Sequence, residues 1–174
     1  LFRTDLFLTF TSDDIVGVEI GGAVKNVIAI ATGISDGLKF GHNSRAAIIT
    51  RGLYEMIKIG KAFGANLLTF AGLSGIGDLV LTCTADMSRN HTVGKKIGEG
   101  QKISKILGDM KVVAEGVPTA KAVFELTKKY NINAPICDAM YRIIYEGMSP
   151  RDAVTKLCNL PLREELSSII RKDI

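Results

Sequence analysis

The sequence predicts an all-α fold, with several helices packed into one domain. Its 174 residues are 47% hydrophobic but only 6% aromatic and include no tryptophan, a composition that suits close packing of aliphatic and small residues between helices. Most apolar residues recur at helical spacing, in segments joined by short turns. The one β-like run, residues 6–11, is too short to form a sheet by itself. No repeat or low-complexity linker divides residues 15–174, so the fold class is all-α.

The charge pattern favours a small anionic ligand over a nucleic acid. Lysine and arginine exceed aspartate and glutamate by 22 to 18, which gives a net charge of +4. The sequence has no run of five or more like charges and no alternation of basic with aromatic residues. Nucleic-acid binding is therefore not expected.

The few cysteines and histidines predict no metal site. The three cysteines are odd in number and lack metal-ligand spacing, which fits reduced thiols in a cytoplasmic protein. The sequence has no signal peptide and no uninterrupted apolar segment of about 18 residues, so no membrane span is expected. Because the chain begins with Leu1 rather than methionine, we expect it to be a fragment of a longer protein.

The first expected helix, over 14–37, is apolar on nearly all sides and is therefore predicted to be buried. From residue 17 to residue 31 only three residues are polar: Glu19, Lys25 and Asn26. Gly21 and Gly22 lie one turn before Lys25, and helical side chains lean toward the N-terminus, so an open slot is expected beside the ammonium group. The slot could admit a ligand. Alternatively, the glycines serve close helix packing and the lysine reaches out to water.

Capping residues and apolar spacing predict the remaining helices. A helix is expected over 44–63, with Ser44 as its N-cap and Glu55 facing water. A short helical piece follows, beginning at Asn66 or Thr69. Further helices are expected over 88–97, 104–108, 135–146 and 149–158, and one more has Pro118 in its first turn and ends before the turn at 131–133. The tail after about residue 160 carries no inference.

Two segments present polar groups at expected helix starts. Residues 72–84, GLSGIGDLVLTCT, predict a tight glycine turn that presents Asp78 and several backbone amides. This turn is not the dinucleotide-binding fingerprint, because Val80 stands where a third glycine is required. Ser88 can cap the following helix, whose free N–H groups and Arg89 would suit a phosphate. An ordinary serine cap beside a solvated arginine is the alternative.

Several of these segments together resemble one family, the bacterial NAD(P)-dependent glycerol-3-phosphate dehydrogenases, in their C-terminal half. The resemblance covers roughly residues 6–160 and rests on GVEIGGAVKNVIAIATGISDGLKFG (17–41), ITRGLYEM (49–56), GLSGIGDLVLTCT (72–84), SRN (88–90) and VAEGVPT (113–119). The family combines an N-terminal Rossmann domain with a helical substrate domain. The resemblance implies that residues 1–14 end the nucleotide domain or form its connector. Residues 15–174 would then be the helical C-terminal substrate-binding domain.

The resemblance also implies roles for individual residues. The lysine of the GGAVKN block is the family's catalytic proton donor and acceptor, and it corresponds to Lys25. Substrate contacts are implied for Lys25, Asp78, Ser88, Arg89 and Asn90. Cofactor contacts are implied for Arg89, Val113 and Glu115.

The activity implied by the resemblance is the NAD- or NADP-dependent interconversion of sn-glycerol 3-phosphate and dihydroxyacetone phosphate, a step that supplies glycerophospholipid synthesis. The cofactor would be bound mainly by the chain's own N-terminal Rossmann domain, so the fragment alone is expected to be inactive. A homodimer is also expected.

Two other functions compete with this one. A related dehydrogenase of the hydroxyacid or 6-phosphogluconate type also has a helical substrate domain with a lysine on its long helix. From a different class, the chain could be a non-catalytic interaction or dimerisation module. The second alternative predicts that Lys25, Asp78 and Arg89 lie scattered rather than together.

Overall fold

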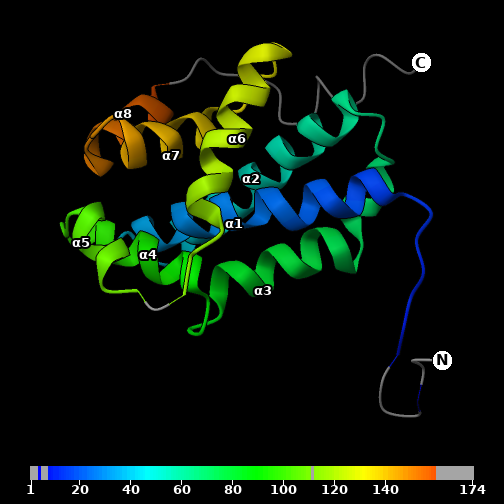
Figure 1. The fold of residues 1–174 in the computed structure, drawn as a ribbon, viewed down its shortest axis with the longest axis horizontal. Coiled ribbons are helices and arrows are strands. Elements are labelled where there is room, and N and C mark those ends of the chain that lie inside the picture. Colours follow the sequence, from blue (N-terminus) through cyan, green and yellow to red (C-terminus); the bar gives the residue numbers. More distant parts are fainter. Residues whose placement is uncertain (1–3, 5–7, 111, 160–174) are drawn as a thin grey trace.

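The computed structural model describes residue 4 and residues 8–110 and 112–159 (Figure 1). The described residues contain eight α-helices: α1 (Ile15–Gly37), α2 (His42–Ala62), α3 (Asp78–Thr84), α4 (Arg89–Gly98), α5 (Ile103–Gly108), α6 (Gly116–Lys129), α7 (Pro135–Tyr145) and α8 (Pro150–Cys158). A 3₁₀ turn, η1 (Leu67–Ala71), and a π turn, η2 (Leu73–Gly77), lead into α3. The all-α prediction is therefore confirmed.

The N-terminal β-like run can be compared with the structure only in part. Residues 8–11 are irregular and exposed rather than a strand, while residues 6 and 7 lie outside the described part of the chain. The tail after residue 160 lies outside it as well.

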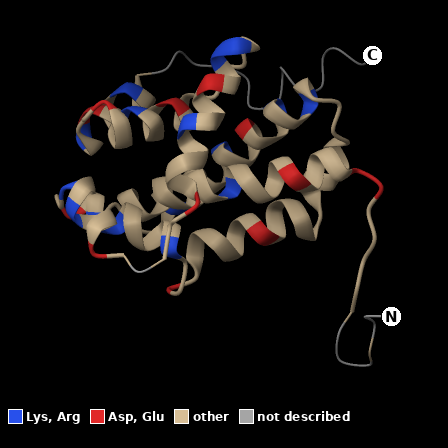
Figure 2. Ribbon diagram, in the orientation of Figure 1, with Lys and Arg blue, Asp and Glu red and all other residues tan. Residues whose placement is uncertain are grey.

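The long helix α1 is the core of the domain, as its apolar sequence predicts. It runs through the middle of the molecule and packs against α2, α3, α4, α6 and α7 (Figure 1). Val27, Ile28 and Ile30 are completely buried. Figure 2 shows few charged residues along α1 compared with the helices around it.

Asp14 fixes the start of α1. Its Oδ1 accepts the backbone N–H of Gly17 at 2.9 Å, and Oδ2 accepts the N–H of Asn66 at 2.9 Å and the hydroxyl of Thr69 at 2.6 Å. The pKa of Asp14 is held below its usual value, mainly by the hydrogen bond from the Thr69 hydroxyl and to a lesser extent by the backbone N–H donors. The cap therefore also ties α1 to the segment that leads into α3.

Helices α1 and α4 approach so closely that their backbones touch. A Cβ at Gly33 would lie 2.1 Å from the carbonyl oxygen of His91, and one at Gly94 would lie 2.0 Å from that of Ile30. No side chain fits at either position without moving a helix. The two glycines thus set the position of α4, including its N-terminus, on α1.

The start of α2 differs from the prediction. The helix begins at His42 rather than after Ser44, because Gly41 adopts a φ of 84° and turns the chain three residues earlier. The hydroxyl of Ser44 donates to the carbonyl of Phe40 instead of capping the helix. Helix α6 begins at Gly116, which places Pro118 in its first turn as expected.

The prediction that Glu55 faces water is wrong. Its side chain is buried, and its carboxylate accepts the backbone N–H groups of Ile136 at 2.7 Å and Cys137 at 3.0 Å. Helix α7 lacks a capping side chain of its own at Ala134, so Glu55 of α2 caps it from a neighbouring helix. Burial raises the pKa of Glu55 to about 7, although the two N–H donors act in the opposite direction.

Candidate functional site

Lys25 and Asp78 form an ion pair at the centre of the domain. The ammonium of Lys25, halfway along α1, donates to Oδ2 of Asp78, the first residue of α3. Their side chains are 20% and 34% exposed, so the pair lies at the surface of the core and can be reached by a ligand. The hydroxyl of Thr82, one turn along α3, donates to the Asp78 carbonyl oxygen at 2.7 Å and lies 3.3 Å from Oδ1. Thr82 therefore steadies the carboxylate that holds the lysine.

The glycine turn before α3 brings Asp78 to Lys25. A Cβ at Gly75 would lie 2.2 Å from the carbonyl oxygen of Phe70, so the turn can fold this tightly only with glycine. The turn also lies against α1, because a Cβ at Gly21 would be 2.7 Å from the carbonyl oxygen of Ser74. The glycine turn is present as the π turn η2, but it runs directly into α3, so Asp78 lies within continuous helix rather than at a free helix start as expected.

Gly21 and Gly22 turn out to serve different purposes. Gly21 allows close packing against the glycine turn, which was the plainer of the two explanations. A Cβ at Gly22, in contrast, would meet nothing within 4 Å. Open space therefore remains at Gly22, one helical turn before Lys25, and not at Gly21.

The N-terminus of α4 carries the next three candidate residues. Ser88 caps the helix, with its Oγ accepting the N–H of His91 at 3.3 Å, as predicted. Arg89 is exposed and makes no ion pair with any described residue. A guanidinium beside free helix N–H groups is an arrangement suited to an anion.

Asn90 connects three helices instead of pointing freely into solvent. It is buried, its amide donates to Oδ1 of Asn26 at 2.8 Å, and its Oδ1 accepts the N–H of Gly116 at 2.8 Å. Asn26 in turn donates to the carbonyl of Gly22 at 3.0 Å. Since Asn26 follows Lys25 and Asn90 follows Arg89, this network joins the parts of α1 and α4 that carry those two cations.

The first turn of α4 is held on its other side by Asp36 near the end of α1. Nε2 of His91 lies 2.7 Å from Oδ2 of Asp36, and Arg45 of α2 donates to both oxygens of the same carboxylate, at 3.1 and 2.7 Å. Burial alone would raise the pKa of Asp36, but the hydrogen bonds and charges of Arg45 and His91 outweigh burial and lower it. Asp36 is thus ionised at neutral pH and anchors α4.

Val113 and Glu115 lie in the segment just before α6, and both are exposed. The next residue, Gly116, lies against α1: a Cβ there would be 2.6 Å from the carbonyl oxygen of Asn26. The segment 113–115 is therefore held beside Asn26 and Asn90, with Val113 and Glu115 free to meet a molecule outside this chain.

Two site residues were missed by sequence reasoning, Asn26 and Thr82. Asn26 directly follows the lysine in the GGAVKN block, and Thr82 lies one helical turn after Asp78. A polar residue on an otherwise apolar helix was the only signal for Asn26. Nothing local distinguished Thr82.

The described residues contain no group of three or more histidine, cysteine, aspartate or glutamate side chains that could hold a metal ion. Among these residues one helix, α1, is long and apolar enough to cross a membrane by length and composition alone. The packing of α1 against five other helices identifies it as a core helix of this domain.

The fold and the site together define an all-α domain built on one buried helix, which carries a lysine–aspartate ion pair. The chain belongs to the family described as the C-terminus of NAD-dependent glycerol-3-phosphate dehydrogenase, whose model matches residues 14–155.

Curated relatives extend the comparison. The chain is 56% identical over 164 residues to the glycerol-3-phosphate dehydrogenase (NAD(P)+) of Citrifermentans bemidjiense, covering 94% of this chain and 49% of the relative. It is 53% identical over 165 residues to that of Geobacter sulfurreducens, covering 95% of this chain and 49% of the relative. The chain therefore spans about half the length of these curated relatives.

A solved structure has the same fold. The crystal structure of glycerol-3-phosphate dehydrogenase from Coxiella burnetii superposes with a TM-score of 0.87 at 43% sequence identity, covering 90% of this chain and 48% of that one.

Proposed function

We propose that this chain is the substrate-binding half of an oxidoreductase that interconverts sn-glycerol 3-phosphate and dihydroxyacetone phosphate with NAD or NADP, in the supply of glycerophospholipid precursors. The observation that carries the proposal is the Lys25–Asp78 ion pair beside the open face of Gly22. The names of the relatives supply the substrate and the cofactor class. The alternative of a non-catalytic module predicted that Lys25, Asp78 and Arg89 lie scattered, and the contact between Lys25 and Asp78 argues against it for these two residues.

The chemistry assigns a proton transfer to Lys25. When bound, the nicotinamide cofactor supplies or accepts the hydride. As the substrate carbonyl becomes an alcohol, negative charge grows on its oxygen, and Nζ of Lys25 donates a proton to that oxygen. In the reverse direction the neutral amine takes the proton from the alcohol. Asp78 holds Nζ in place through the ion pair.

The phosphate is assigned to the start of α4. The free N–H groups after Ser88 and the guanidinium of Arg89 both attract a dianion. Asn90 uses its side chain to join α1, α4 and α6, so we propose that it contacts the substrate only through its remaining hydrogen-bonding capacity. Val113 and Glu115 are proposed to meet the cofactor together with Arg89.

Arg89→Ala in the full-length protein should raise KM for dihydroxyacetone phosphate by about 10- to 100-fold, because a charge-assisted hydrogen bond to the phosphate is lost. The measurement is a steady-state assay that follows oxidation of NADH and, separately, of NADPH. Arg151→Ala, on the exposed face of α8, is the matched control and should leave KM unchanged. An unaltered KM in Arg89→Ala would place the phosphate elsewhere.

Gly22→Ala tests whether a ligand occupies the open slot. An added methyl group meets nothing within 4 Å, so the helix should keep its stability or gain up to about 1 kcal/mol. Turnover should nevertheless fall about tenfold or more if substrate or nicotinamide approaches the backbone there. Gly108→Ala in α5, which is equally open, is the control for both measurements. Full activity in Gly22→Ala would show that the slot is empty during turnover.

The missing partner is proposed to be the chain's own N-terminal Rossmann half, in a cytoplasmic enzyme. Several large apolar residues are exposed on η1, η2, α3 and the start of α1, elements that contact one another: Ile15, Leu68, Leu73 and Leu81. This surface suits burial against another domain. Homodimer formation is a separate proposal, which the molar mass of the full-length protein in solution would test.

A further inference from the structure

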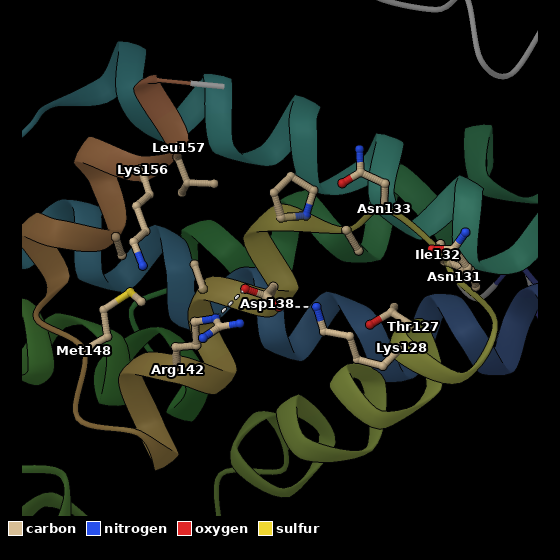
Figure 3. Close-up of a pocket in the computed structure, with 14 residues that line it drawn as sticks. Thr127, Lys128, Asn131, Ile132, Asn133, Asp138, Arg142, Met148, Lys156 and Leu157 are labelled. Atoms are coloured by element: carbon tan, nitrogen blue, oxygen red, sulfur yellow. Dashed lines mark hydrogen bonds and ion pairs between the residues drawn. The ribbon is translucent and has the colours of Figure 1, made fainter. Parts of the chain in front are cut away.

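A second hollow lies between α6, α7 and α8 and involves none of the candidate site residues (Figure 3). Its volume is about 660 Å³, within the range of small-molecule pockets. Nothing in the proposed reaction uses it. Its lining therefore needs an explanation of its own.

The hollow carries more positive than negative charge. Lys128 of α6, Arg142 of α7 and Lys156 of α8 line it, together with one carboxylate, Asp138. Glu146 accepts from Nη1 of Arg142 at 3.1 Å but is not part of the lining. Among the described residues that line the hollow, three are cations and one is an anion.

The single carboxylate is already shared by two of the cations. Oδ1 of Asp138 lies 3.0 Å from Nζ of Lys128, and Oδ2 lies 2.7 Å from Nε of Arg142. Burial would raise the pKa of Asp138, but the hydrogen bonds and charges of Arg142 and Lys128 outweigh burial and lower it. Asp138 is therefore ionised, with its charge directed at Arg142 and Lys128.

The side chain of Lys156 forms no ion pair or hydrogen bond with any described residue, and Figure 3 shows it extending from α8 toward the hollow. The ammonium group of an exposed lysine usually extends into water. Here the chain places one over a hollow that already contains two other cations.

The rest of the lining combines apolar surface with amide groups. Ile132, Met148 and Leu157 supply large apolar side chains, while Asn131 and Asn133 supply donors and acceptors (Figure 3). This mixture matches a ligand with an apolar body and a charged end. We propose that the hollow binds a small organic anion, whose headgroup contacts Lys156 and whose short apolar body packs on Met148 and Leu157.

Butyl phosphate serves as the probe, added to the full-length protein labelled with ¹⁵N. Arg89→Ala is used as the background, so that the candidate substrate site does not compete. The backbone amides of Asn133 and Asp138 should shift and saturate, while those of Lys25 and Asp78 should shift little. Inorganic phosphate and butanol, tested separately, should each bind more weakly than butyl phosphate. Phosphate lacks the apolar body, and butanol lacks the negative charge.

Lys156→Glu should weaken butyl phosphate binding by about tenfold or more, since it replaces an attractive charge by a repulsive one. Lys121→Glu, an exposed lysine of α6 outside the lining, is the matched control and should bind as the parent does. Lys156→Met, which removes the charge but keeps the apolar stem, should give an intermediate loss. Unshifted amides around the hollow, or equal binding in the Lys156→Glu and parent proteins, would overturn the proposal.

Discussion

Replacing Lys25 by alanine in the full-length protein should lower kcat for dihydroxyacetone phosphate reduction by about 10² to 10⁴, the usual contribution of a positioned general acid. The proton that must reach the new alcohol oxygen would then come from water rather than from a positioned ammonium group. The loss should appear in kcat more than in KM, because the proton is transferred only in the reaction step. Initial rates with NADH and NADPH provide the measurement.

The controls separate chemistry from folding. Lys25 is only partly buried, so its removal should leave the helical circular dichroism unchanged and the cofactor still bound. Lys121→Ala removes an exposed lysine of α6 and should keep full activity. Asp78→Asn, which keeps the side-chain shape but loses the charge that holds Nζ, should also lower kcat. Turnover close to the parent level in Lys25→Ala would refute the assignment of the proton donor.

Glu55→Ala should destabilise the domain by about 2 to 4 kcal/mol, the largest effect on stability that we expect from one polar residue. The substitution leaves the N–H groups of Ile136 and Cys137 buried without an acceptor, because α7 has no cap of its own. Urea denaturation followed by circular dichroism measures the loss. Glu125→Ala, on the exposed side of α6, should change stability by less than about 0.5 kcal/mol.

The free energy of unfolding should depend differently on pH in the parent protein and in Glu55→Ala. The folded protein holds the pKa of Glu55 at about 7, above its ordinary value of 4.5, so between these values the folded state binds the proton more tightly than the unfolded state. The stabilisation that comes from this raised pKa is therefore complete below pH 4.5, and it is lost as the pH rises to about 7. The stability difference between the parent and Glu55→Ala should accordingly be larger at acidic than at neutral pH. An equal difference at both would mean that the carboxylate titrates normally.

Most helices could be predicted from the sequence because helix formation depends on nearby residues. The capping serines Ser88 and Ser149 begin α4 and α8 as expected, each accepting an N–H three residues later. The position of Pro135 correctly marks the start of α7. The start of α2 was misplaced because Gly41 turns the chain earlier than a serine cap would indicate.

The candidate site was predictable to the extent that its residues occur in recognisable local patterns. Lys25 on an apolar helix, Asp78 after a glycine turn and Arg89 after a capping serine each have a sequence signature. Their roles remain predictions. The hydrogen bond from Asn90 to Asn26, which connects α4 to α1, could not be predicted from a local pattern, because the two residues are far apart in the chain.

The sequence by itself determined that the domain is all-α, that α1 is its buried centre, and that a lysine interrupts that helix. Only the tertiary structure decided that Gly21 packs against the glycine turn while Gly22 stays open, and that Glu55 caps a neighbouring helix instead of facing water. The physical reason is the range of the interactions. Helical periodicity and caps act within a few residues, whereas the partner of a buried polar group depends on which surfaces meet when the helices pack.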